Sequence, residues 1–213
     1  MSIAKKKPPI KETVGSQYVC FNTMSEDGEW TKNYETEVEQ TDVVKSVKVT
    51  ENSNSAPIYS SGILYDTVNE TPSVNVEVEV IAFPDETLHK MRGDLVDKGG
   101  LILSGGSGKD RTRPYFAYGK VVKMKGGKFR FDWFPKCKLS ENTDETKTKE
   151  ENFSEQTDTI TIVAYPFNDA GDIVAKVSSD VNFPEGLTEE KFFAKPILDV
   201  AGLTAAVSGS AGA

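Results

Sequence analysis

Apolar and polar residues alternate with a period of two over several parts of the chain. The clearest run is 74–80, where four valines alternate with one asparagine and two glutamates. Residues 43–50 and 159–162 have similar alternation. Such a period places apolar side chains on one face of an extended strand and polar side chains on the other. The pattern therefore predicts half-buried antiparallel strands and a mainly β fold.

A β-hairpin is predicted for residues 115–139. Gly126 and Gly127 lie between two β-rich arms, and a two-residue hairpin turn requires the positive φ angles that glycine adopts readily. Side chains two positions apart on a strand point to the same face, so the second arm should bury an aromatic face in the sheet. The aromatic residues that share this face are Phe129, Phe131 and Trp133.

Two helices are predicted. Residues 85–95 begin with two acidic residues, which favour a helix N-terminus, and their apolar residues Leu88, Met91 and Leu95 are spaced by three and four. Residues 188–193 follow a Thr-x-Glu pattern that approximates a capping box. Two helices among many strands leave the fold mainly β.

The 213 residues are sufficient for one sizeable domain. We assign this domain to residues 13–200. Residues 1–12 are rich in lysine and proline and are predicted to be a flexible N-terminal arm. Residues 201–213 are rich in glycine and alanine and are predicted to be a flexible C-terminal tail. Residues 140–156 form a long polar loop within the domain, and loops of this length are usually functional or disordered.

Charge is distributed in blocks of opposite sign. The net charge is −8, but residues 109–138 contain ten basic residues against two acidic ones, a local balance of +8. Residues 26–42 contain seven acids and one lysine, and residues 141–158 contain seven acids and two lysines. Such blocks are typical of solvated faces, and they also suit a surface that docks on copies of itself.

The sequence contains no recognisable catalytic, cofactor-binding or metal-binding constellation. His89 is the single histidine, and Cys20 and Cys137 are too far apart for a zinc motif. The glycine-rich residues 105–109 lack the first glycine of a phosphate-binding loop and have aspartate after the lysine. We predict a protein that is not an enzyme and has no cofactor. No signal peptide or membrane-spanning run is recognised, so we expect the cysteines to remain thiols in the cytosol.

An alternative function is nucleic-acid binding by the basic hairpin 109–138. Aromatic side chains on a basic sheet can stack on bases. Against this function, residues 128–131 do not match the order of an RNA-recognition strand, and the sequence pI is about 4.9. Core packing accounts more simply for the aromatic residues of this hairpin, which are Tyr115, Phe116, Tyr118, Phe129, Phe131 and Trp133.

Several landmarks between residues 43 and 167 occur in an order that resembles a known family. They are the Ser-Ala-Pro-Ile-Tyr-Ser-Ser-Gly segment 55–62, the valine-rich strand, Phe-Pro-Asp-Glu-Thr-Leu at 83–88, Pro-Tyr-Phe-Ala-Tyr-Gly at 114–119, the Gly-Gly hairpin, and the arm 129–141. This order resembles the major tail proteins that build the tube of non-contractile siphophage tails, especially in phages of Gram-positive bacteria. Members often have aspartate near positions 60 and 61, where this chain has serines, and some have an additional immunoglobulin-like domain.

The resemblance implies an antiparallel β-sandwich with a flanking helix. It also implies hexameric rings that stack into a hollow tail tube through which DNA passes without stable binding. Tape-measure, tail-terminator and distal tail proteins would be further partners, no membrane is involved, and the protein would be made in the host cytoplasm and act in the virion. We expect the following charged residues to contact neighbouring copies: Lys123, Lys125, Lys128, Glu141, Asp144, Glu145, Lys147, Lys149, Glu150, Glu151 and Glu155.

Overall fold

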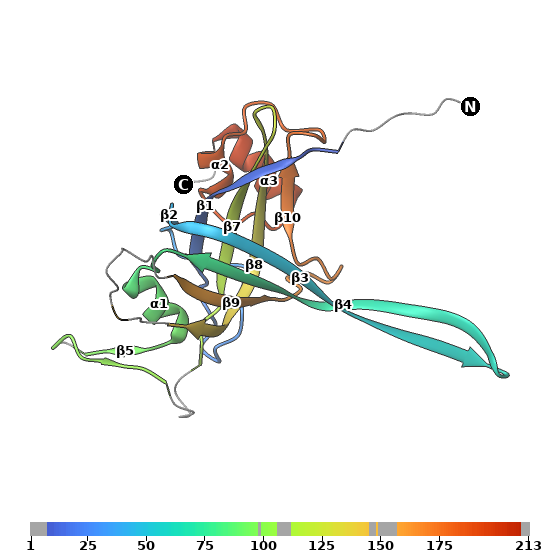
Figure 1. Ribbon diagram of the computed structural model, residues 1–213, viewed down its shortest axis with the longest axis horizontal. Coiled ribbons are helices and arrows are strands. Elements are labelled where there is room, and N and C mark those ends of the chain that lie inside the picture. Colours follow the sequence, from blue (N-terminus) through green and yellow to red (C-terminus); the bar gives the residue numbers. More distant parts are fainter. Residues whose placement is uncertain (1–7, 98, 106–111, 145–147, 149–156, 210–213) are drawn as a thin grey trace.

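The computed structural model describes residues 8–97, 99–105, 112–144, 148 and 157–209 (Figure 1). Strands dominate the described chain, in agreement with the mainly β prediction. The strands are β1 (Lys11–Phe21), β2 (Glu39–Thr41), β3 (Val44–Ser60), β4 (Ile63–Val80), β5 (Leu95–Val96), β6 (Ile102–Leu103), β7 (Phe116–Met124), β8 (Lys128–Thr143), β9 (Asp158–Ala164) and β10 (Ala175–Ser178). The helices are α1 (Asp85–Arg92), α2 (Glu189–Phe193) and α3 (Val200–Ser208).

Eight strands form one continuous antiparallel sheet. Its order is β2-β1-β7-β8-β9-β4-β3, and β10 pairs with β8 beside this path. Strands β5 and β6 form a separate two-stranded sheet. The antiparallel mainly β prediction is confirmed, but hydrogen bonding connects the large strands into one sheet, so a sandwich of two sheets is not confirmed.

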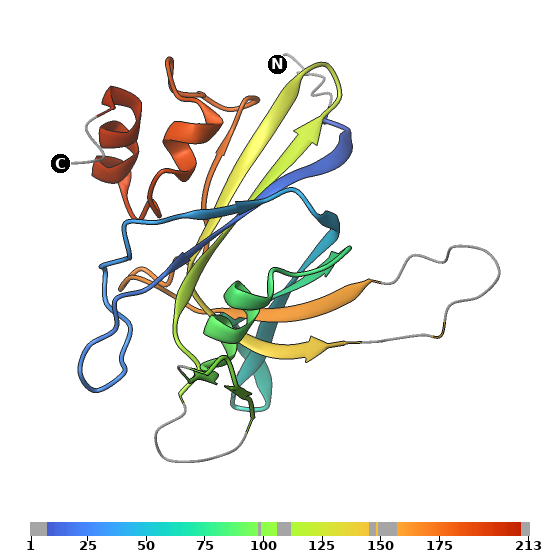
Figure 2. The same ribbon diagram turned by 90° about the vertical axis from the view of Figure 1, so that its left-hand side faces the viewer.

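The long strand β8 joins two parts of this sheet that run in different directions (Figure 2). Its first part pairs with β7 on one side and with β10 on the other, where Trp133 lies opposite Ala175. Its second part pairs with β9, starting at Cys137 opposite Ala164. Register shifts interrupt the ladders on both sides, between Phe116 and Tyr118 of β7 and near the end of β8. Such bulges bend a strand and increase its twist, which allows the sheet to curl.

One face of the curled sheet encloses an inner core. The valines of 74–80 all point into it, so the predicted alternation is confirmed. Helix α1 closes one side of this core through Met91, and it ends at Gly93, which has the left-handed conformation typical of a helix C-terminus. The buried residues of the inner core are Val19, Phe21, Val74, Val76, Val78, Val80, Phe83, Met91, Phe116, Tyr118, Phe134, Cys137, Leu139, Ile160, Ile162, Ala164 and Ile173.

The opposite face of β1, β7 and β8 carries an outer core that α2 and α3 cover. Phe193 stacks on Tyr18 with ring centroids 3.9 Å apart, and the Trp133 indole donates a hydrogen bond of 3.0 Å to the Phe192 carbonyl. The predicted helix at 188–193 is confirmed, since the Thr188 hydroxyl accepts from the Lys191 backbone. The buried residues of the outer core are Tyr18, Cys20, Tyr34, Ala117, Val121, Phe131, Trp133, Leu187, Phe192, Phe193, Ile197 and Ala206.

The flexible tail predicted at 201–213 is wrong for its described part. Helix α3 occupies this segment, with the Asp199 carboxylate accepting a 2.7 Å hydrogen bond from the Gly202 backbone as an N-cap. Ala206 is buried against the outer core, and Leu203 packs beside it. The small side chains therefore form a packed helix surface, and residues 210–213 lie outside the described chain.

Four other boundaries differ from the prediction. Helix α1 ends at Arg92 instead of residue 95, because Gly93 adopts the left-handed conformation, and Leu95 belongs to β5. Strand β1 begins at Lys11, so the last two residues of the predicted arm 1–12 belong to the sheet, and residues 1–7 lie outside the described chain. Residues 140–143 of the predicted loop extend β8 and pair with β9. Met124 lies opposite Lys128, so the β7–β8 turn contains three residues instead of two, with positive φ at Gly126 and Gly127.

The close approach of α2 to β7 depends on the absence of a side chain at Gly119. A Cβ at this position would lie 2.7 Å from Phe193 Cε1 and 3.0 Å from Trp133 Cζ3. We predict that Gly119→Ala lowers the free energy of unfolding by about 1–3 kcal/mol, because overpacking forces rings of the outer core to move. Denaturant unfolding followed by tryptophan fluorescence measures this change.

The matched control is Gly202→Ala in α3. A Cβ there would meet Asp199 Oδ1 at 3.4 Å, an ordinary contact, and alanine favours helix. This control should leave stability unchanged or raise it by up to about 1 kcal/mol. Equal unfolding midpoints for Gly119→Ala and the wild type would contradict the tight packing described here.

Candidate functional site

The hairpin of β3 and β4 extends far beyond the body of the protein (Figure 1). The two strands pair from Val44 opposite Val80 to Ser60 opposite Ile63. Strand β4 pairs with β9 over Val74–Val80, so the pairs described beyond this point are between β3 and β4. We call residues 52–73 the outer ribbon. At about 3.3 Å per residue, its nine β3 residues span roughly 30 Å.

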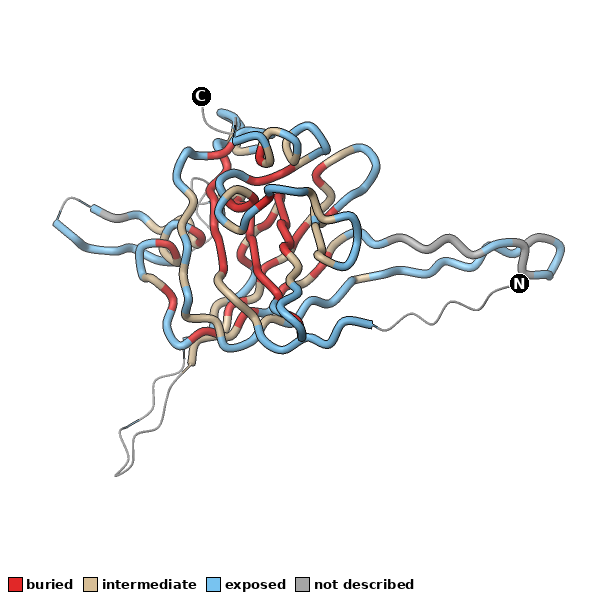
Figure 3. Tube along the Cα trace, turned by 90° about the horizontal axis from the view of Figure 1, so that it is seen from above, coloured by how far each residue is buried: buried red, intermediate tan, exposed pale blue. Residues whose placement is uncertain are grey.

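The local sequence explains why the outer ribbon leaves the body. Apolar alternation ends after Val49, and the next residues are polar, so this stretch has no apolar face to bury. Ser61 and Gly62 have φ angles of 52° and 76°, as a tight two-residue hairpin turn requires. Figure 3 shows buried residues gathered in the body and exposed residues along most of the described ribbon.

Apolar side chains are exposed at the tip of the outer ribbon. Ile58 is exposed, and Tyr59 and Ile63 retain 66% and 72% of their accessible surface. An isolated two-stranded hairpin is only marginally stable in water, and exposed apolar groups of this kind favour contact with another surface. The sequence has no lysine or arginine between Lys48 and Lys90, so the charged groups of the ribbon are acidic. The outer ribbon is therefore an acidic arm with an apolar tip.

A second exposed apolar element is the small hairpin of β5 and β6. Leu95, Leu101, Ile102 and Leu103 are all exposed on it. Its base is held to α1 by Asp94, whose carboxylate lies 2.8 Å from His89 Nδ1 and accepts a 2.7 Å hydrogen bond from Ser104.

Asp94 and His89 form a structural contact at this base. Burial by itself raises the pKa of Asp94, but the hydrogen bonds from His89 and Ser104 and the charge of Arg92 outweigh burial and lower it. His89 is half-buried and connects α1 to the residue that precedes β5.

The aromatic residues of the basic hairpin are mostly inside the protein. Phe116, Tyr118, Phe131 and Trp133 are buried, and Phe129 packs against the outer core. Tyr115 is half-buried, with the Lys138 ammonium 4.0 Å from its ring centroid. Stacking on nucleobases requires exposed ring faces, so this arrangement does not favour the nucleic-acid alternative.

The structure separates the predicted contact residues into two groups. Lys123, Lys125 and Lys128 are exposed near the β7–β8 turn, and Lys128 forms an ion pair with Asp180. Glu141 lies near the opposite end of β8 and Asp144 directly after it, roughly 40–50 Å from Lys128 when measured along the strand at about 3.3 Å per residue. The two groups could meet only between copies. The other predicted contact residues lie outside the described chain: Glu145, Lys147, Lys149, Glu150, Glu151 and Glu155.

Sequence reasoning recognised parts of the outer ribbon but not its projection. It identified the alternation at both ends and the 55–62 segment as separate landmarks. The missed signal was a continuous strand-like stretch from 43 to 80 interrupted by a single Ser-Gly turn. A hairpin with arms of 17 and 18 residues is much longer than a typical strand pair, and its outer half cannot be covered by a domain of this size.

The described residues offer little for catalysis or metal binding. No group of three or more His, Cys, Asp or Glu side chains suited to a metal ion occurs within the described ranges. Cys20 and Cys137 are buried free thiols, as predicted, and burial raises the pKa of Cys20 to about 12. A thiol with this pKa is a poor nucleophile at neutral pH. None of the helices in the described part has the length and apolarity needed to span a bilayer.

Comparisons with protein-family models and with curated proteins found no match to this sequence. The outer ribbon, the small apolar hairpin and the exposed strand edges are therefore interpreted from their own geometry.

The outer ribbon should be dispensable for folding of the body. We predict that replacing residues 53–72 by an Asn-Gly turn changes the free energy of unfolding by no more than about 1 kcal/mol, because none of the ribbon residues whose side chains the structure describes belongs to either core and shorter loops change closure entropy little. Thermal and denaturant unfolding of the shortened protein measure this change. Loss of cooperative unfolding in the shortened protein would show that the ribbon stabilises the body.

Proposed function

We propose that this protein is a self-assembling structural subunit that forms the hollow tube of a phage tail. The single observation that carries the proposal is the outer ribbon. It extends about 30 Å from a well-packed body and presents an apolar tip to solvent. A monomer gains little from such an arm, whereas a neighbouring copy can bury the tip and pair with its backbone.

The edges of the sheet also support assembly. Strand β3 is one edge of the sheet, and β2 covers only Gln17–Val19 of β1 among the described pairs. The backbone groups of edge strands are natural sites for pairing with another chain. Copies arranged around an axis could therefore close a ring through their edges, while the ribbons reach across to neighbours.

The hexameric ring, the stacking of rings and the passage of DNA are proposed from the family resemblance. The net charge of −8 suits this role, because a lumen rich in lysine would hold DNA by counterion release. In this proposal, tape-measure, tail-terminator and distal tail proteins are further partners, and the protein acts in the virion. The polar segment 140–156 remains a predicted contact between rings.

Assembly should depend on the ribbon tip. We predict that Tyr59→Ser combined with Ile63→Ser raises the protein concentration needed for rings or tubes at least about tenfold, because burial of two large apolar side chains contributes several kcal/mol and 1.4 kcal/mol corresponds to tenfold. The shortened-ribbon protein should fold and fail to assemble. Light scattering and negative-stain microscopy of concentrated protein provide the measurement.

Val181→Ser is the matched control, since Val181 is 71% exposed and lies outside the ribbon. This control should assemble like the wild type. Wild-type protein that stays monomeric at all concentrations and salts would contradict the proposed function. Normal tubes formed by the tip variant would instead show that another surface drives assembly.

The basic hairpin should have no working affinity for nucleic acid. Its main aromatic side chains are buried, so binding would rest on charge alone and would weaken steeply with salt. We predict no binding of DNA or RNA at roughly micromolar protein and physiological salt, measured by fluorescence anisotropy. Salt-sensitive binding under these conditions that Lys123→Glu with Lys125→Glu abolishes would favour the nucleic-acid alternative.

A further inference from the structure

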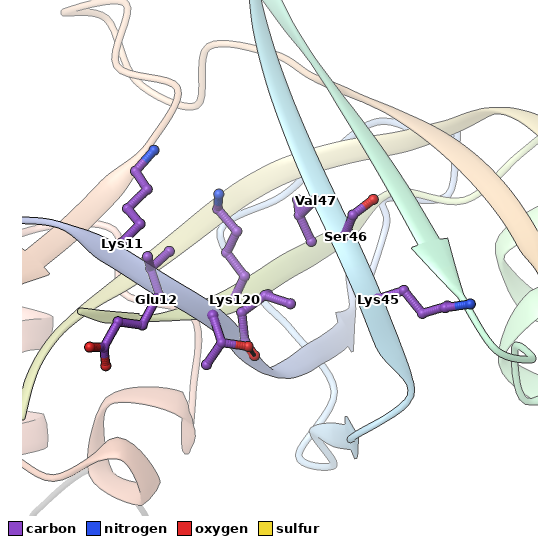
Figure 4. Close-up of a pocket in the computed structure, with 9 residues that line it drawn as sticks. Lys11, Glu12, Lys45, Ser46, Val47 and Lys120 are labelled. Carbon is purple, nitrogen blue, oxygen red and sulfur yellow. Dashed lines mark hydrogen bonds between the residues drawn. The ribbon is translucent and has the colours of Figure 1, made fainter. Parts of the chain in front are cut away.

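A groove of about 240 Å³ lies between the N-terminal half of β1 and the beginning of β3 (Figure 4). The side chain of Lys120, from β7, lies between these two strands. The groove is lined by residues of the body and is separate from the ribbon tip proposed for assembly. Its chemistry is set by an unusual arrangement of charges at Lys120.

Lys120 is a buried cation whose charge is only partly balanced by one carboxylate, that of Asp132. Its side chain is 7% exposed, and its Nζ lies 3.7 Å from Asp132 Oδ2. Asp132 is buried too, and Arg130 donates to both of its oxygens, at 2.8 Å from Nε and 2.9 Å from Nη2. The 3.7 Å separation is longer than a normal hydrogen bond, so the Lys120 ammonium keeps donor capacity for a further acceptor.

Positive charge around Lys120 exceeds negative charge. Figure 4 shows the ammonium groups of Lys11 and Lys120 extending in the same direction, whereas the carboxylate of Glu12 and the ammonium of Lys45 point away from them. Burial is the main cause that lowers the pKa of Lys120, the charges of Arg130 and Lys11 lower it further, and Asp132 opposes them. Lys120 and Arg130 therefore share the Asp132 carboxylate, and Lys11 adds a further positive charge at the groove.

We propose that the groove between β1 and β3 binds an oxyanion, a carboxylate or a phosphate, through Lys120 and Lys11. A buried charge is stabilised by a counter-ion and by hydrogen bonds, and an oxyanion supplies both to Lys120. Arg130 holds Asp132 in place, so that carboxylate cannot turn to satisfy Lys120 fully. The anion has two possible sources, a free ion in solution or a carboxylate side chain of a second copy.

The test uses the full chain at a concentration below any assembly, with inorganic phosphate and acetate as probes. Each is titrated at constant ionic strength against sodium chloride, and the ε-methylene signal of Lys120 is followed by proton–carbon NMR. The signal is identified by its absence in Lys120→Met. A saturable shift of the Lys120 signal with either probe is the expected result, and it should weaken at least several-fold in Lys11→Met.

Lys125→Met is the control, because it removes one exposed lysine at the β7–β8 turn, outside the groove, and should leave the titration unchanged. If Lys120→Met fails to fold, Lys11→Met still tests the site. The remaining lysine signal that Lys11→Met shifts is then assigned to Lys120. A Lys120 signal that neither phosphate nor acetate moves, or an equal response in Lys11→Met, would overturn the proposal. These outcomes do not depend on assembly.

A second arm distinguishes the two sources of the anion. Phosphate that slows assembly of the wild type, relative to chloride at equal ionic strength, supports competition with a carboxylate of a second copy. Assembly that is insensitive to phosphate, with a saturable Lys120 shift, supports a free anion as the ligand.

Discussion

The fold depends on burial of both faces of the hairpin formed by β7 and the first part of β8. Residues 116–122 of β7 are buried without interruption, because the curled sheet covers one face and the C-terminal helices cover the other. Trp133 and Phe134 are adjacent in β8 and point into different cores. Each core therefore supports the same two strands from opposite sides, and dispersion and hydrophobic burial are concentrated there.

The absence of a side chain at Gly119 and the ring of Phe193 bring the helices close to this hairpin. The stacked pair of Tyr18 and Phe193 adds a favourable aromatic contact, and the Tyr18 hydroxyl donates a 2.7 Å hydrogen bond to Glu189 at the start of α2. This contact joins the first strand of the chain to its C-terminal region. The Tyr18–Glu189 hydrogen bond thus connects two parts of the fold that are 171 positions apart in the sequence.

The body and the outer ribbon differ in whether their apolar side chains are buried within the same chain. In the body, strand backbones are hydrogen-bonded and apolar side chains are buried within one chain. This is achieved by a sheet that bends at β8 and by two cores that share its central strands. In the ribbon, the backbone of each strand forms hydrogen bonds on its inner side with the other strand, but apolar tip residues remain exposed to water. Exposed apolar groups of this kind favour contact with a second molecule, which is why the ribbon is the principal support for the proposal that the protein assembles.

The sequence by itself determined the elements whose signals are local. The valine alternation at 74–80, the start of the first helix at Asp85, and the hairpin with Gly126 and Gly127 follow from side-chain periodicity and backbone preference. The free thiol of Cys20 agrees with the expectation that the cysteines remain thiols. Among the predicted contact residues, Lys125 is exposed at the β7–β8 turn, and its contact with a neighbouring copy stays a prediction.

Only the tertiary structure decided features that depend on distant partners. A nine-residue helix such as α3 is too short to be stable alone, so its formation depends on packing against the outer core, which no local pattern of Gly, Ala and Ser reveals. Likewise, alternation identifies strands but does not say where β9 stops pairing and the ribbon begins. No local pattern indicates the burial of the charged residues Lys120 and Asp132, which are 6% and 2% exposed in the folded sheet.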